Sequence, residues 1–179
     1  FAPAPSKFTL VGGLFQDYAP TAFHMKYCLL PLLARMGVVI DLEIVRPGYV
    51  PEGKGLLKLT VHPIDRALVS VPSLEQGRID TIKMVALSSH LSDAHVGSRM
   101  MEACERSVKK DGFRTESEIL EDTTAAQKGA ALLAWTVSET GAVLGSDMAG
   151  ARGRSSEKIG RSVAHDLVRD IRSNACVDV

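Results

Sequence analysis

Hydrophobic and polar positions change their spacing several times along the first part of the chain. Lys7–Val11 alternates polar and apolar side chains up to a pair of glycines, which is typical of a half-buried strand that ends in a turn. Apolar residues then recur at helical spacing over residues 25–36, and Gly37 stands where a left-handed residue often ends a helix. Val38–Val45 and Leu56–Val61 are rich in residues that favour strands. This first block is therefore predicted to be strand, helix, strand, strand.

Pro31 interrupts the helical pattern of the first block. Because its ring clashes with the preceding turn and it has no N–H to donate, we expect a kink at this residue. The helix is still predicted, since the apolar positions on either side of the proline share one face. We expect that face to bury Met25, Leu29, Leu32, Leu33 and Met36.

A second block follows a loop over residues 62–77 that holds two prolines. Ile79–Leu87 is a strand candidate, and Ser92 offers an N-cap for a helix that runs to about Lys110 and stops at Gly112. The buried stripe of this helix is predicted to be Val96, Met100, Ala103 and Val108.

Three strands and a helix complete the second block. The strand candidates, the last two at hairpin spacing, are Arg114–Glu121, Ala130–Ser138 and Ala142–Ser146. The final helix begins near Ser155 or Ser156, and we expect Glu157 to pair with Arg161 on its outer face. Its buried positions follow at intervals of four: Ile159, Val163, Leu167 and Ile171.

Both blocks mix strands with helices, which predicts an α/β protein of the α+β kind. The economical arrangement is two units, each with helices on one face of a small mixed sheet. We place these units at residues 1–76 and 77–175, and assign residues 176–179 to a return toward the first unit.

Composition limits what the chain can do. It has 179 residues, and 45% of them are hydrophobic, which is enough to build a packed core. Its 21 basic and 21 acidic residues cancel, so any binding of nucleic acid must rest on a local patch of charge.

The cysteines and the termini bear on location. Three widely spaced cysteines predict free thiols in a reducing compartment, and therefore a cytoplasmic protein. The sequence shows neither a signal peptide nor a stretch of about 20 apolar residues that could form a membrane helix. His90 and His95 are five residues apart, a spacing that argues against a shared metal site on one helix face, and we assign no metal ligands. The chain begins without methionine, and we expect further segments on both sides of it.

Several short motifs stand in a distinctive order along the first block. They are Ala4-Pro5-Ser6, Gly12-Gly13, Ala19-Pro20, Leu30-Pro31-Leu32-Leu33 and the turn from Gly48 to Leu57. In this order they resemble the RNA 3'-terminal phosphate cyclase family, which shares its core fold with the enolpyruvyl transferases. The turn looks like the family signature and departs from it twice, since Pro47 replaces an Arg or His and Lys54 replaces the middle of three glycines.

The resemblance implies a fold and an activity. The fold would be part of a repeated βαβ-type core, with a four-stranded, two-helix insert domain formed by the second block. The activity would be that of an ATP-dependent, ligase-type enzyme, which converts an RNA 3'-phosphate to a 2',3'-cyclic phosphate through a covalent histidyl-AMP. The family's histidine should lie beyond Val179, so we assign no catalytic residue. ATP with Mg²⁺ and the 3'-phosphate end of an RNA are the implied cofactors and partner; the oligomeric state does not follow.

The resemblance also implies site residues. Pro20 matches a proline that the family packs against adenine, and the candidates for cofactor binding are Pro20, Phe23 and His24. The candidates for contact with RNA phosphates flank the signature turn or precede the last helix: Arg46, Lys54, Arg152 and Arg154. Each has a structural alternative, as a helix start, a turn or a solvated loop.

Two other functions remain open. Eukaryotic cyclase-like members of the family lack the catalytic histidine and act as binding proteins in ribosome assembly, and the altered signature is compatible with such a role. An enolpyruvyl transferase would share the core fold, but that family lacks the insert domain, and fold alone does not decide chemistry.

Overall fold

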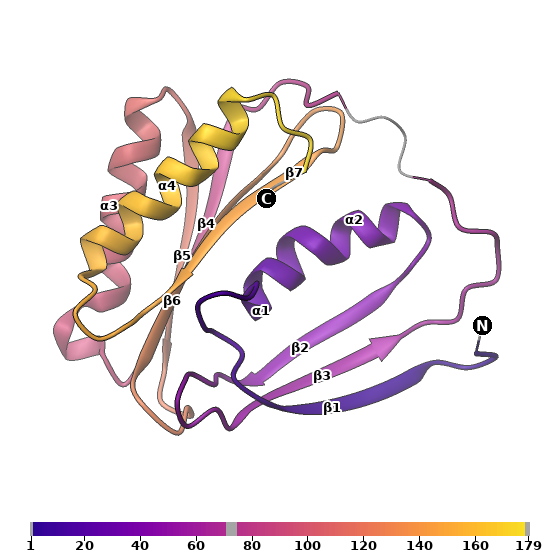
Figure 1. The fold of residues 1–179 in the computed structure, drawn as a ribbon, viewed down its shortest axis with the longest axis horizontal. Coiled ribbons are helices and arrows are strands. Elements are labelled where there is room, and N and C mark those ends of the chain that lie inside the picture. The colour runs from indigo at the N-terminus through magenta and orange to yellow at the C-terminus, as the bar shows by residue number, and fades with distance from the viewer. Residues whose placement is uncertain (1, 71–74, 178–179) are drawn as a thin grey trace.

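The computed structural model describes residues 2–70 and 75–177. It contains two sheets with strand orders β1-β3-β2 and β5-β4-β6-β7 (Figure 1), so the predicted α+β class is confirmed. The elements are β1 (Ser6–Gly12), α1 (Ala22–His24), the π-helical turn η1 (Met25–Leu29), α2 (Leu30–Arg35), β2 (Ile40–Arg46), β3 (Gly55–Val61), β4 (Thr81–Ser89), the 3₁₀ turn η2 (Ser92–Ala94), α3 (Val96–Lys110), β5 (Arg114–Asp122), β6 (Gly129–Val137), β7 (Val143–Ala149) and α4 (Ser156–Arg172). Residues 71–74 of the predicted loop and the last two residues of the predicted return segment lie outside this description.

The first sheet is antiparallel with β3 at its centre. Leu57 of β3 lies opposite Leu10 of β1 and Ile44 of β2, so apolar side chains of all three strands share one face. The helical segment α1-η1-α2 covers that face (Figure 1). The predicted order of strand, helix, strand, strand is confirmed.

The helix of the first unit differs from its prediction around Pro31. A π-helical turn, in which the N–H of Leu30 donates to the carbonyl of Met25, comes just before the proline. The wider turn accommodates the carbonyl groups that the ring would otherwise meet. The buried face also differs from the expected one: Leu29 is 36% exposed, whereas Cys28 and Leu30 are buried. The other four expected positions are partly buried: Met25, Leu32, Leu33 and Met36.

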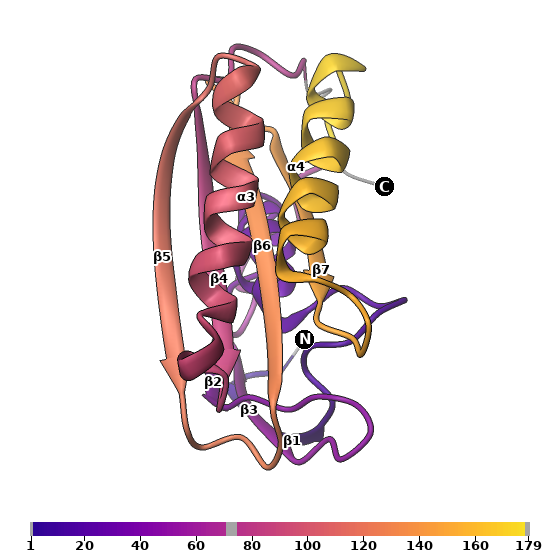
Figure 2. The same cartoon turned by 90° about the vertical axis from the view of Figure 1, so that its left-hand side faces the viewer.

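The second sheet is mixed and carries two helices on one face. β4 pairs with β5 in parallel, and α3 connects these two strands in the chain. On its other side β4 pairs antiparallel with β6, which forms a hairpin with β7. Figure 2 shows α3 and α4 side by side in front of this sheet. The predicted buried rows of both helices are confirmed, except that Val96 is only partly buried. Gly160 lets the helices approach, because a Cβ there would lie 2.3 Å from the carbonyl oxygen of Met100.

The opposite face of the second sheet is also buried, which the sequence did not predict. Side chains of β4 and β6 alternate, and those that point away from α3 and α4 pack against the first unit in a second core. From the sheet this core contains Val85, Leu87, Ala131, Leu133 and Val143, and from the first unit Phe15, Ala22, Phe23, Cys28, Tyr49 and Leu57. The two units therefore stack as helices, sheet, helix, sheet (Figure 1).

Two local predictions for α3 and α4 are wrong. Ser92 does not cap α3: its hydroxyl donates to the Glu121 carboxylate at 2.6 Å, and the helix begins at Val96 after a left-handed His95. Glu157 does not pair with Arg161 but accepts a hydrogen bond from Arg99 Nε at 2.8 Å, which lowers the pKa of Glu157 to about 2. The N-cap of α4 at Ser155 is confirmed, since its hydroxyl accepts the Lys158 N–H.

No helix among the described residues has the length and apolar character needed to cross a bilayer.

The close contact of α3 with α4 predicts a large effect of a small substitution. Gly160→Ala should lower the free energy of unfolding by about 2 kcal/mol, because the added methyl group overlaps the backbone of α3. Gly12→Ala is the control, since nothing lies within 4 Å of a Cβ at that glycine, and it should change stability by less than about 0.5 kcal/mol. Urea unfolding of both variants measures the difference, and equal effects would contradict this packing.

Candidate functional site

A cleft of about 760 Å³ lies where the first unit meets β7 and α4. The loop after β1 forms one wall, the middle of β7 forms the floor, and the last turns of α4 form the other wall. Its lining is Gln16, Asp17, Tyr18, Ala19, Pro20, His24, Gly145, Ser146, Asp147, Met148, Arg154, Asp166, Arg169 and Asp170. Both its size and its mixture of apolar and charged groups fall within the range of small-molecule sites.

An ion pair between Asp17 and Arg154 joins the loop after β1 to the loop before α4, and both residues line the cleft. The guanidinium donates from Nη1 to Oδ1 at 2.9 Å and from Nη2 to Oδ2 at 2.8 Å, and Nη1 also donates to the Ala149 carbonyl at 2.7 Å. These hydrogen bonds hold the pKa of Asp17 below its usual range and raise the pKa of Arg154. The pair is only partly exposed, so it fixes the loop after β1 against the loop before α4.

A second polar contact fixes the start of α1 over β7. The backbone N–H of Thr21 donates to Asp147 Oδ2 at 2.8 Å, and the Thr21 hydroxyl accepts the N–H of His24 at 3.3 Å. Gly145 makes the approach possible, because a Cβ there would lie 2.4 Å from Cys28 Sγ and 3.4 Å from the His24 ring. His24 therefore lies directly over the floor of the cleft.

The α4 wall carries more acid than base. Arg169 donates to Asp170 at 2.9 Å and to Asp166 at 3.2 Å, and Asp170 is only 8% exposed. The full lining has four aspartates and two arginines, and both arginines already bind carboxylates. The cleft thus offers hydrogen-bond acceptors and apolar surface, but its lining has no uncommitted guanidinium.

The structure brings together three of the residues predicted from the resemblance. Pro20, His24 and Arg154 all line the cleft. Phe23, in contrast, is 4% exposed and packs edge-on against Phe15 in the second core, with ring centroids 4.9 Å apart. Its ring is therefore part of the hydrophobic core and does not face the cleft.

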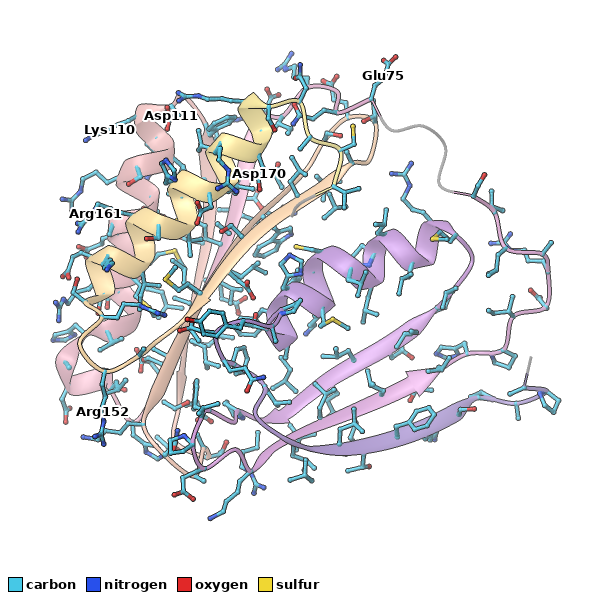
Figure 3. All side chains as sticks on the ribbon, viewed as in Figure 1. Glu75, Lys110, Asp111, Arg152, Arg161 and Asp170 are labelled. Carbon is cyan, nitrogen blue, oxygen red and sulfur yellow. The ribbon has the colours of Figure 1, made fainter. Side chains whose placement is uncertain are left out.

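The remaining candidates lie elsewhere. Arg46 donates from Nε to the Lys54 carbonyl at 2.9 Å, and so braces the signature turn from inside. Lys54 adopts the left-handed conformation, with φ of 53°, which explains how the turn accommodates a residue other than glycine there. Arg152 is exposed in the loop before α4, where Figure 3 shows it projecting outward.

The signature turn is held by the second unit. Gln127, between β5 and β6, donates to the Val50 carbonyl at 2.7 Å and accepts the Glu52 N–H at 3.2 Å. Tyr49 enters the second core, its hydroxyl lies 2.8 Å from the Ser89 hydroxyl, and burial raises the pKa of Tyr49. The turn therefore keeps a defined shape although Pro47 and Lys54 depart from the family signature.

Sequence reasoning missed the acidic half of the site. Asp17, Asp147 and Asp170 lie in three segments far apart in the chain, and none belongs to a recognisable motif. Only the helical spacing of Asp166, Arg169 and Asp170 was visible beforehand, and it also fits an ordinary solvated helix face.

Comparisons with known proteins agree on one family. A sequence model of the RNA 3'-terminal phosphate cyclase insert domain matches residues 74–172. RNA 3'-terminal phosphate cyclases of Pyrobaculum aerophilum and Pyrobaculum neutrophilum are 29% and 31% identical over 178 residues, and each match covers 99% of this chain and 51% of the relative. A probable RNA 3'-terminal phosphate cyclase of Dictyostelium discoideum is 27% identical, with 42% of its length covered. The chain thus spans about half the length of these relatives.

The ion pair across the cleft predicts a pH-dependent stability. Because the folded protein depresses the pKa of Asp17, the pair stabilises the protein above the unfolded pKa of about 3.9 and loses its effect as pH falls through the folded pKa. Asp17→Asn should therefore cost about 1 kcal/mol at pH 7 and progressively less below about pH 4. Asp65→Asn, at an exposed loop position, is the control and should show no such trend. Thermal unfolding as a function of pH tests this, and parallel curves for both variants would contradict it.

Proposed function

This chain belongs to the RNA 3'-terminal phosphate cyclase family, and from that premise we propose that its protein converts RNA 3'-phosphate ends to 2',3'-cyclic phosphates with ATP. A histidine outside the 179 residues would attack the α-phosphorus of ATP and release pyrophosphate. The AMP would pass to the RNA 3'-phosphate, and the 2'-hydroxyl would then close the ring and release AMP. The observation that carries the proposal is that relatives named for this activity align with 99% of the chain.

The cleft supports part of an ATP site. Pro20 and His24 present ring surfaces that suit a purine base, and aspartate oxygens suit ribose hydroxyls, which donate hydrogen bonds. The triphosphate fits less well, because Arg154 and Arg169 are both engaged by carboxylates. We therefore propose that this chain holds the nucleoside end, and that cationic groups from outside it, with Mg²⁺, hold the phosphates.

The signature turn favours the enzyme over a cyclase-like binding protein. The departures at Pro47 and Lys54 are the feature that raises the second possibility. Lys54 nevertheless takes a backbone conformation of the kind that a glycine would supply, and Arg46 and Gln127 hold the turn on both sides. An intact turn supports the cyclase reaction, and the ribosome-assembly role becomes the alternative outcome of the test.

Incubation of full-length protein with [α-³²P]ATP tests the proposal. We expect a protein-bound label that is labile in acid and stable in base, as a phosphoramidate of histidine requires. His24→Ala should raise the ATP concentration for half-maximal labelling by about tenfold, since a base stacked on a ring contributes about 1–3 kcal/mol.

The control for that substitution is His62→Ala. This histidine lies after β3, hydrogen-bonds to Asp41 at 2.6 Å, and is not among the residues that line the cleft. It should leave labelling unchanged. A folded wild-type protein that takes up no label would remove the cyclase assignment and favour the binding role, whereas equal effects of the two histidine variants would remove only the nucleoside assignment of the cleft.

A further inference from the structure

The outward face of α4 carries a continuous row of basic side chains, which we call the basic stripe: Lys158, Arg161, His165, Arg169 and Arg172. All five residues are exposed, at intervals of three or four. At about 100° per residue they occupy one side of the helix, directly opposite the buried row that packs on the sheet. The stripe is about 21 Å long, given a rise of about 1.5 Å per residue.

Part of the stripe is free of local ion pairs. Arg169 and Arg172 contact Asp170 and Asp111, but Lys158 and Arg161 form no ion pair within residues 2–70 and 75–177. Arg99 of neighbouring α3 neutralises Glu157, the acid closest to them in sequence. The N-terminal half of the stripe is therefore left with uncompensated positive charge.

The neighbouring helix extends the positive surface. α3 lies beside α4 (Figure 2) and exposes Arg106 and Lys110, which also form no ion pair within the described parts of the chain. Figure 3 shows Lys110 and Arg161 projecting outward from the helical layer. Exposed Glu102 of α3 is an opposing charge on the same helix. Because the chain as a whole has 21 basic and 21 acidic residues, this surface is a local excess of positive charge.

The stripe is continuous with the cleft. Arg169 belongs to the stripe and also lines the cleft, together with Asp166 and Asp170 of the same helix turns. At its other end the stripe begins next to the loop that carries exposed Arg152. A polyanion whose end lay beside a nucleotide bound in the cleft could therefore follow α4 toward its N-terminus.

We propose that the basic stripe binds the sugar–phosphate backbone of the RNA whose 3' end meets the nucleotide held in the cleft, and so positions the substrate without reading its sequence. This inference rests on the proposed function and extends it from the reacting end to the body of the RNA. Phosphate contacts from lysine and arginine are independent of base identity and release bound counterions, so they make affinity depend on salt. Arg154, committed to Asp17, is a structural residue in this arrangement.

The salt dependence of RNA binding tests the stripe. The double variant Lys158→Gln/Arg161→Gln removes its two residues without ion pairs, and Lys7→Gln/Lys128→Gln removes two exposed lysines on other surfaces with the same change of net charge. We would measure dissociation constants of full-length protein for a single-stranded RNA with a 3'-phosphate between 50 and about 300 mM salt. The stripe variant should bind the RNA about tenfold more weakly at low salt. The steepness with which its log association constant decreases with log salt concentration should be smaller by about 1.4, or about 0.7 per lost phosphate contact.

The charge-preserving variant Lys158→Arg/Arg161→Lys should restore binding, and the Lys7/Lys128 variant should behave as the wild type. All variants should take up the adenylyl label from ATP equally, so a failure of the stripe is distinguishable from a failure of the proposed function. Equal RNA affinity and slope for the stripe variant and its control would overturn the inference. Stripe-dependent binding of polyglutamate with no binding of RNA would overturn it as well and would assign the surface to an acidic protein partner.

Discussion

Burial of the second sheet on both of its faces sets the positions of all the other elements. Helices α3 and α4 cover one face, and the first unit covers the other through Phe23 and Tyr49. This second core fixes where the loop after β1 meets β7 and α4, and therefore where the cleft forms. Without it, Pro20 and His24 would have no fixed relation to Arg154. Aromatic contacts and the clamp from Gln127 to the signature turn extend the same interface.

Much of the fold could be predicted from local patterns, because period and turn chemistry depend on neighbours in the chain. The strands, the order of elements and the buried row of α4 were predicted correctly. The π turn before Pro31 was not, since the sequence shows only that a regular helix is unfavourable there. The prediction of an N-cap at Ser92 was wrong because Glu121, which is distant in sequence, accepts the hydrogen bond from its hydroxyl. The apolar run of β6 predicted a strand, but nothing in it showed that both of its faces would be buried or that the first unit would be the partner.

The candidate site likewise contains residues that could be predicted from the sequence and residues that could not. Pro20 and His24 were found through a family resemblance and do line the cleft, whereas Phe23 from the same motif is part of the core. The aspartates of the cleft were not found, because a carboxylate becomes part of a site only through tertiary contacts such as that between Asp17 and Arg154. The sequence analysis did not single out the basic stripe, because exposed basic residues at helical spacing also fit an ordinary solvated face, and only the structure shows that this helix borders the cleft.

Unfolding of the 179-residue chain, followed by two probes, tests whether the shared core joins the two units. The chain has one tryptophan, Trp135, which stacks on Tyr27 of the first unit with ring centroids 4.6 Å apart and therefore reports on the interface. Far-ultraviolet circular dichroism reports on the secondary structure of both sheets. If the shared core holds the two units together, the two signals will change in a single coincident transition with urea. A change of Trp135 fluorescence at lower urea, with the circular dichroism still native, would show that the interface opens while the units stay folded, and would contradict the account.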